Sequence, residues 1–227
     1  MRLRPLTRSI PKCLVKIRAK SLLEYWLDAM LRAGVTKCVV CTHHHAHQIR
    51  DRIAALGASV RPRVVESYEP ELLGSAGALS RNVDLADGVS DVLVIYADNF
   101  SDICLSQFLQ FHRSHHLGFT MLLFRAPDPR ACGIVRCDRS GTIVHFEEKP
   151  EIPSSDLANA GVYAMTAATY REVASLSVRD IARDVVPRLV GRMKGLVHRG
   201  YHRDIGTIES LKQACRDMQK GIVCGSQ

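Results

Sequence analysis

Residues 92–99 have the sequence Val-Leu-Val-Ile-Tyr-Ala-Asp-Asn. The first six residues are apolar and rich in β-branched side chains, which is typical of a strand buried on both faces. Two polar residues, Asp98 and Asn99, follow at once. In open α/β sheets, ligands bind at the carboxyl ends of such strands. Asp98 is therefore a candidate site residue from its position alone.

On both sides of this strand, the hydrophobic period alternates between strand-like and helix-like. Ser21 and Glu24 have the spacing of a capping box, ahead of a helix that Gly34 ends. Arg139-Ser-Gly141 is a hairpin turn, and Thr207 can cap a terminal helix that begins near Ile208. Further elements are expected at 37–42, 45–56, 60–66, 103–115, 119–125, 160–165, 167–175, 179–191 and 196–203. This alternation predicts a single α/β domain over residues 1–227.

The composition excludes several classes of protein. The chain has 227 residues, of which 46% are hydrophobic and 24% are charged, so a disordered or fibrous protein is not expected. It has no uninterrupted apolar run of about 18 residues, the length that a membrane span needs. Eight cysteines without a secretory signal favour free thiols over disulfides. We expect a soluble, cytoplasmic protein without a membrane partner.

The positive charge is concentrated at the start of the chain. The formal net charge is +8, and residues 1–20 contain seven basic side chains and no acidic one. Such a segment could be an organellar presequence, a nucleic-acid-binding arm or a phosphate-binding loop. Pro5 and Pro11 disfavour an amphipathic presequence helix, and the segment has no aromatic residue on which a base could stack. We expect no nucleic-acid partner.

A second acidic residue, Asp204, lies just before the terminal helix. Two carboxylates at strand ends are a common way to hold Mg²⁺, which keeps water and substrate phosphates as its other ligands. With the basic loop, they would suit phosphoryl or nucleotidyl transfer. The alternative is that Asp98 merely ends a strand and Asp204 merely lies beside a helix cap.

Other polar clusters are expected to be structural. The histidines at 43, 44, 45 and 47 have no cysteine or acid at a spacing that would complete a metal site. Cys38 and Cys41 copy a redox motif but fall within a strand, where they would face opposite sides. The histidines at 112, 115 and 116 are expected on a solvated helix end.

Six motifs, in order, resemble those of sugar-1-phosphate nucleotidyltransferases. The first is Arg2-Leu-Arg-Pro-Leu-Thr7 with Pro11-Lys12, which matches the second half of the family signature. The others are Glu69-Pro-Glu-Leu-Leu-Gly-Ser-Ala-Gly77, Tyr96-Ala-Asp98, Cys132-Gly-Ile-Val135 with Phe146-Glu-Glu-Lys-Pro150, Asn159-Ala-Gly-Val-Tyr163 and Asp204-Ile-Gly-Thr207. The resemblance covers about residues 2–215. It implies a Rossmann-like, mixed and mostly parallel sheet flanked by helices, without a C-terminal β-helix.

The resemblance also implies a reaction. A phosphate oxygen of a sugar 1-phosphate attacks the α-phosphorus of a nucleoside triphosphate (NTP), which gives an NDP-sugar and pyrophosphate. By similarity, Arg2 and Lys12 would bind the triphosphate, and Asp98 and Asp204 would bind Mg²⁺. Lys149 would bind the sugar phosphate. The nucleotide would contact Gly74, Ser75, Ala76 and Gly77, and the sugar would contact Gly133, Glu148 and Asn159. The small residues 74–77 would let a flat base approach closely.

The sequence departs from the family at its start, because Met1 stands where the family has threonine. The family's first apolar strand and glycine-rich turn, which cradles the triphosphate, have no counterpart, and we expect a native polypeptide about ten residues longer. The motifs most resemble mannose- or heptose-1-phosphate guanylyltransferases of polysaccharide pathways. Uridylyl- and thymidylyltransferases, a glycosyltransferase and a non-catalytic nucleotide-sugar-binding relative stay open. A homo-oligomer is possible.

Overall fold

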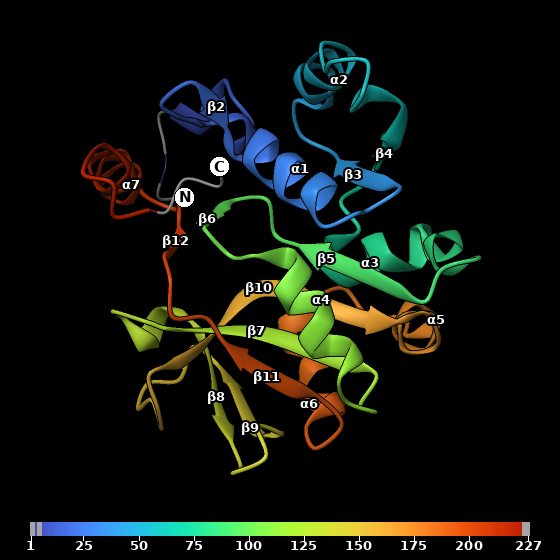
Figure 1. Ribbon diagram of the computed structural model, residues 1–227, viewed down its shortest axis with the longest axis vertical. Helices are drawn as coiled ribbons and strands as arrows, with labels where there is room; N and C mark the ends of the chain where they lie inside the picture. The colour runs from blue at the N-terminus through green and yellow to red at the C-terminus, as the bar shows by residue number, and fades with distance from the viewer. Residues whose placement is uncertain (1–2, 4–5, 224–227) are drawn as a thin grey trace. The chain divides into compact units, whose positions relative to one another are not determined.

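The computed structural model describes residue 3 and residues 6–223 (Figure 1). The chain divides into two compact units, each assembled from separate segments. The first unit comprises residues 1–72, 97–106 and 200–227, and the second comprises residues 73–96 and 107–199. The prediction of a single domain stays a prediction.

The first unit begins with a short ribbon and a capped helix. Strands β1 (Lys16–Ile17) and β2 (Lys20–Ser21) pair antiparallel and lead into α1 (Leu22–Arg32). The predicted capping box is confirmed: Ser21 Oγ accepts from the backbone N–H of Glu24, and the Glu24 carboxylate accepts from that of Ser21 at 2.9 Å. Both bonds satisfy amide groups that the first turn leaves unpaired. The helix then buries one face, on Leu22, Leu23, Trp26 and Leu27.

That face packs on a small parallel sheet. Strands β3 (Cys38–Thr42) and β4 (Val64–Tyr68) pair in parallel, and α2 (Ala46–Ala54) connects them. Apolar side chains of the two helices and two strands form one core, which includes Leu23, Leu27, Cys38, Ile49, Ile53 and Val64. Burial of this shared face accounts for the parallel order, since a crossover helix must cover the sheet that it connects.

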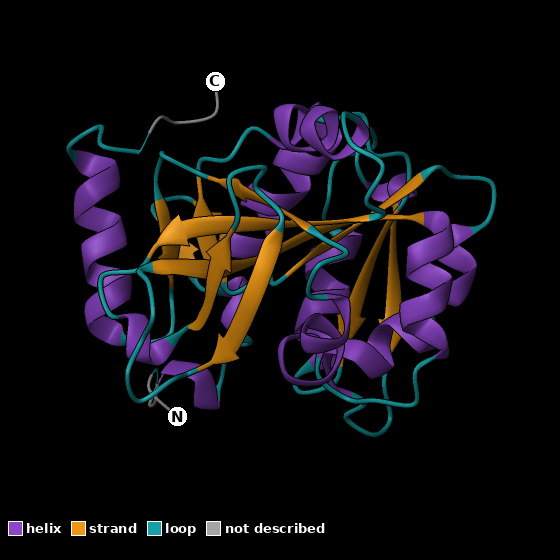
Figure 2. Ribbon diagram, turned by 90° about the horizontal axis from the view of Figure 1, so that it is seen from below, coloured by secondary structure: helices purple, strands orange, loops and turns teal. Residues whose placement is uncertain are grey.

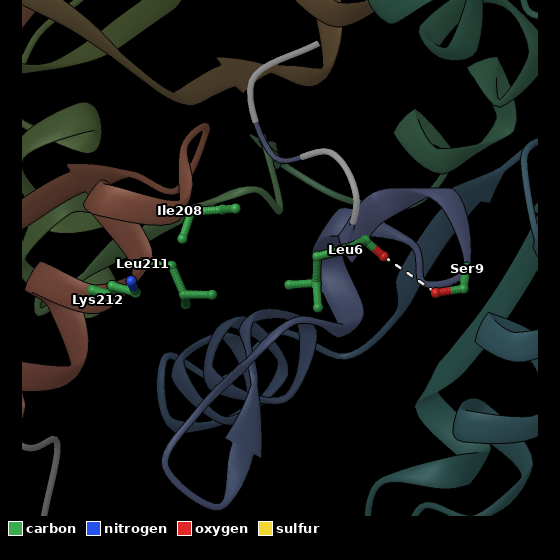
Figure 3. A pocket seen from close by; sticks show the side chains of 5 residues that line it. All are labelled: Leu6, Ser9, Ile208, Leu211 and Lys212. Carbon is green, nitrogen blue, oxygen red and sulfur yellow. Dashed lines mark hydrogen bonds between the residues drawn. The ribbon is translucent and has the colours of Figure 1, made fainter.

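The C-terminal helix closes a second core in this unit. Strands β6 (Asn99–Ser101) and β12 (His202–Asp204) pair antiparallel, and α7 (Ile208–Gln219) follows. Thr207 caps α7 as predicted, by accepting from the backbone N–H of Ser210 at 3.0 Å. The core beneath includes Leu3, Ile17, Leu22, Phe100, Ile205 and Ala214. A cavity of about 480 Å³ lies beside α7, lined by Leu6, Ser9, Ile208, Leu211 and Lys212 (Figure 3).

The second unit is built on a six-stranded sheet in the order β11-β7-β10-β8-β9, with β5 paired to β10. Its strands are β5 (Asp91–Ile95), β7 (Phe119–Arg125), β8 (Gly133–Cys137), β9 (Ile143–Glu148), β10 (Leu157–Thr166) and β11 (Lys194–Val197). β8 and β9 form the predicted hairpin. Figure 1 shows β10, β7 and β11 side by side.

The mixed α/β class is confirmed, but the expectation of a mostly parallel sheet is wrong. Among the described strands, only β3 with β4 and β11 with β7 pair in parallel. β10 runs antiparallel to each of its three neighbours, β5, β7 and β8. Because β10 lies at the middle of the large sheet, its direction makes most of the pairings antiparallel. Alternating hydrophobicity along the sequence could not reveal this direction.

Helices cover both faces of this sheet (Figure 2). Side chains on one face, such as Phe119, Met121 and Tyr163, share a core with α3 (Gly74–Arg81), α5 (Ala167–Ser175) and α6 (Val186–Leu189). Thr120 lies between Phe119 and Met121, so it faces the other side, where it bonds to His112 of α4 (Leu105–Arg113). Strands β7 and β10, at the middle of the sheet, are therefore buried on both faces.

Three local predictions need correction. The helix expected at 179–191 is a π-helical turn (Ile181–Val185) followed by α6, because Pro187 has no N–H to continue the ladder. The strand expected at 196–203 is divided between β11 and β12, which lie in different sheets. His112 is not solvated but buried, with 2% of its surface exposed.

Candidate active site

The β6–β12 ladder brings the two predicted metal-binding aspartates to one end of the same ribbon. Asp204 pairs with Asn99, and the backbone N–H of Ile205 donates to the carbonyl of Asp98 at 3.1 Å. The two residues are far apart in the sequence but are neighbours across this ladder. Gly206 packs against the Asp204 carboxylate: a Cβ at residue 206 would lie 3.0 Å from each carboxylate oxygen.

Lys12 lies against Asp98. Its Nζ is 3.1 Å from Asp98 Oδ2, and the two side chains are 43% and 36% exposed. An ion pair this exposed contributes only about 0–1 kcal/mol to stability. Lys12, Asp98 and Asp204 thus lie together in the first unit, whereas Arg2 is outside the described residues.

A residue that the sequence did not single out as functional, Trp26, holds β6, and Cys13 lies close to Asp98. The buried indole of Trp26 donates from Nε1 to the Asn99 carbonyl at 2.9 Å, which ties β6 to α1. Cys13, next to Lys12, is half-buried: desolvation raises the pKa of its thiol to about 11, and the nearby charge of Asp98 acts in the same direction. An indole within an apolar helix face was the only sequence signal for Trp26.

The second unit holds the residues predicted at the sugar. Gly133 pairs with Glu148 across the β8–β9 hairpin, and a Cβ on Gly133 would come within 2.8 Å of Glu148 and Phe146. Lys149 follows in the left-handed region, with φ at 54°, and its N–H donates to the Cys132 carbonyl at 3.0 Å. This conformation costs a residue with a side chain about 1–3 kcal/mol, and such strain is concentrated at functional sites.

Asn159 has a structural role in the described residues. Its Nδ2 donates to the hydroxyl of Tyr163 at 2.7 Å, and its Oδ1 accepts from the backbone N–H of Gly161 at 2.9 Å. The pairing of β10 with β7 shifts register between Asn159 and Tyr163, and Gly161 within this shift has φ at 68°. Burial raises the pKa of the Tyr163 phenol well above its ordinary value, which keeps its proton in place. A sugar contact by Asn159 stays a prediction.

The structure gives a different reason for the small residues at 74–77. A Cβ on Gly74 would lie 2.3 Å from the carbonyl oxygen of Arg179, and that same oxygen accepts from the N–H of Ala76 at 2.9 Å. Ser75 Oγ accepts from the N–H of Ile181 at 2.9 Å. Close packing of α3 on the backbone at 179–181 therefore requires residue 74 to be small. Their role in nucleotide binding stays a prediction.

In the histidine-rich turn before α2, two imidazoles bond to backbone carbonyls. Within residue 3 and residues 6–223, no group of three or more His, Cys, Asp or Glu side chains is placed to hold a metal ion. His43 Nδ1 instead bonds to the Glu69 carbonyl at 2.8 Å, and His45 Nε2 bonds to the Arg8 carbonyl at 2.9 Å.

The nucleotidyl transferase family model matches residues 1–221. The chain belongs to this family. It is 29% identical to the catalytic subunit beta of mannose-1-phosphate guanylyltransferase from Drosophila pseudoobscura pseudoobscura, over 90% of this chain and 56% of that protein. It is 28% identical to glucose-1-phosphate adenylyltransferase from Ruminiclostridium cellulolyticum, over 96% of this chain and 57% of that protein. The chain thus spans little more than half the length of these relatives.

The fold is also that of a solved structure. HddC from Yersinia pseudotuberculosis, whose complex with GMP-PN has been solved, superposes with a TM-score of 0.78 at 22% identity, covering 96% of this chain and 94% of HddC. Because the two sequences are only 22% identical, the structural similarity to HddC establishes the fold alone. None of the helices in the described parts of the chain has both the length and the apolar character to cross a bilayer.

Proposed function

We propose that the chain transfers a nucleotidyl group from an NTP to a sugar 1-phosphate. The observation that supports this most directly is that Lys12 pairs with Asp98, while Asp98 and Asp204 are backbone neighbours across the β6–β12 ladder. In the reaction, a phosphate oxygen of the sugar 1-phosphate bonds to the α-phosphorus, and the bond between that phosphorus and the pyrophosphate oxygen breaks. Pyrophosphate leaves with the electron pair.

The protein's main task in such a transfer is to position and neutralise phosphate charge. The Lys12 ammonium is half exposed and its ion pair with Asp98 is a weak surface pair, so the oxygens of a triphosphate can compete for it. Lys149, on the second unit, is proposed to meet the sugar phosphate.

The donor set fits a divalent cation. Asp98 and Asp204 offer carboxylate oxygens, and Asp98 already faces the ammonium group of Lys12. Mg²⁺ binds through one or two carboxylates and keeps water and phosphate oxygens as its other ligands, so a third protein ligand is not needed. When bound, it would neutralise phosphate charge.

For the base and sugar, we propose GTP with mannose or heptose 1-phosphate, as a step toward polysaccharide precursors. The names of the relatives support guanylyl transfer, while the adenylyltransferase among them keeps other bases in competition. The test is pyrophosphate release with Mg²⁺ from four NTPs, each with several sugar 1-phosphates. Release with GTP and one of these two sugars is expected. Release with another pair would correct the substrate, and binding of an NDP-sugar without any release would favour a non-catalytic relative.

A separate variant tests the proposed role of Asp98 in binding the metal ion. In Asp98→Asn, the loss of one anionic oxygen ligand should lower kcat/KM on the order of 100-fold. Asp28→Asn is the matched control, because Asp28 lies on α1 and pairs with Lys20. Full activity in Asp98→Asn would contradict the proposed metal role, whereas an equal loss in both variants would indicate a general effect on folding.

A further inference from the structure

Two side chains from the start of α2 donate to consecutive carbonyls in the loop that precedes Lys12. His45 Nε2 lies 2.9 Å from the Arg8 carbonyl oxygen, and Gln48 Nε2 lies 2.7 Å from the Ser9 carbonyl oxygen. A carbonyl only accepts, so His45 must carry its proton on Nε2. The neutral Nε2–H form and the imidazolium both meet this condition.

The backbone of His45 is held in an unusual conformation that directs its ring at the loop. Its φ is 55°, in the left-handed region that side-chain-bearing residues seldom adopt. The turn is secured from both ends: His43 bonds to the carbonyl of Glu69, and Ala46 and Ile49 are buried at the start of α2. An observed outlier of this kind supports a hypothesis of function.

The bonds from His45 and Gln48 reach the part of the loop where one turn, closed by hydrogen bonds within the loop, is followed by another. In the described part of the loop, internal bonds join Ser9 to the Leu6 carbonyl and Leu14 to the Pro11 carbonyl. Leu6 and Ser9 border the cavity beside α7, where Figure 3 shows their side chains on the opposite wall from Ile208 and Leu211. The bonds from His45 and Gln48 therefore fix the backbone between these internal turns.

We propose that His45 and Gln48 are positioning residues, which set the loop so that the Lys12 ammonium is held at Asp98, ready for the triphosphate. This inference rests on the proposed function. Neither side chain needs to touch substrate. Their effect follows from the cost of misplacing a charged group in an active site, where about 1 Å can cost on the order of 100-fold in rate.

The test compares His45→Gly and Gln48→Ala with the control Asp51→Ala, which lies on the exposed part of the same helix. Glycine suits a φ of 55°, so His45→Gly should melt at the same temperature as the wild type or higher. Its KM for the NTP should nevertheless rise, with a loss of about 10-fold in kcat/KM and no change in KM for the sugar 1-phosphate. A merely structural residue would not separate stability from KM in this way.

The second measurement is amide hydrogen exchange over residues 8–14, without substrate. Exchange should be faster in His45→Gly and Gln48→Ala and unchanged in Asp51→Ala. Wild-type kinetic constants in both variants, or unchanged exchange, would overturn the proposal. If the wild type released no pyrophosphate from any substrate pair, the proposed function would fail instead, and the exchange rates alone would decide whether the two residues hold the loop.

Discussion

Three glycines of this chain differ in what restricts their substitution. Gly74 has φ at 82° and lies directly against the Arg179 carbonyl, while Gly34 has φ at 79° and open space within 4 Å of the point where a Cβ would lie. Gly57 has neither restriction. The three glycines thus separate the cost of the backbone conformation from the cost of a steric clash.

Substitution of these glycines by alanine should give graded losses of stability. Gly57→Ala should be near neutral, and Gly34→Ala should lose about 1–2 kcal/mol from the left-handed conformation alone. Gly74→Ala should lose at least about 2 kcal/mol more, because α3 must move away from the Arg179 carbonyl. Urea denaturation measures all three. An equal loss for Gly74→Ala and Gly34→Ala would contradict the steric argument.

At the scale of elements, a buried polar contact joins α4 to the sheet. His112 Nδ1 is 2.7 Å from Thr120 Oγ1, whose hydroxyl also bonds to His115 Nε2 at 2.9 Å. His112 Nε2 lies 3.5 Å from Asp91, which Arg113 also contacts. Burial lowers the pKa of His112 and of His115, despite the opposing effect of Asp91 on His112.

This contact predicts a loss of stability in acid. Below the ordinary histidine pKa of 6.5, the unfolded chain binds protons that folded His112 does not, so the free energy of unfolding should fall as the pH drops from about 7 to 5. The variant His112→Asn should show a shallower fall, since one of the two imidazoles with a lowered pKa is gone. Urea denaturation at several pH values checks this, and an unchanged slope would rule out His112 as a cause.

At the scale of the whole molecule, neither unit is one continuous segment. The chain passes between them after residues 72, 96, 106 and 199. The core of the second unit includes Ala76, Leu79 and Val92 from its first segment together with Phe119 and Tyr163 from its second. Each unit therefore needs residues that lie far apart in the sequence before its core is complete.

Fragments should reflect this interleaving. A fragment of residues 107–199 lacks α3 and β5, and β5 pairs with five residues of β10, so we expect it to be unfolded. A fragment of residues 73–199 retains both and should show more native secondary structure by circular dichroism. A native-like spectrum from residues 107–199 would show that the strand pairing with β5 is dispensable.

The sequence by itself determined the elements, their caps, the family and most candidate residues. Strands and helices follow from local periodicity, and the capping box at Ser21 and the hairpin at 139–141 depend on residues only a few positions apart. Even the candidate metal pair, Asp98 and Asp204, could be named from motifs.

Only the tertiary structure decided how these pieces pair. Long-range hydrogen bonding set the antiparallel direction of β10, divided the segment 196–203 between two sheets, and placed Lys12 on Asp98 beside Asp204. The tertiary structure also buries His112, and it shows that residue 74 must be small because it lies against the Arg179 carbonyl. The physical reason is that a residue's own periodicity predicts which of its sides is buried, but not which distant backbone or charge will lie there.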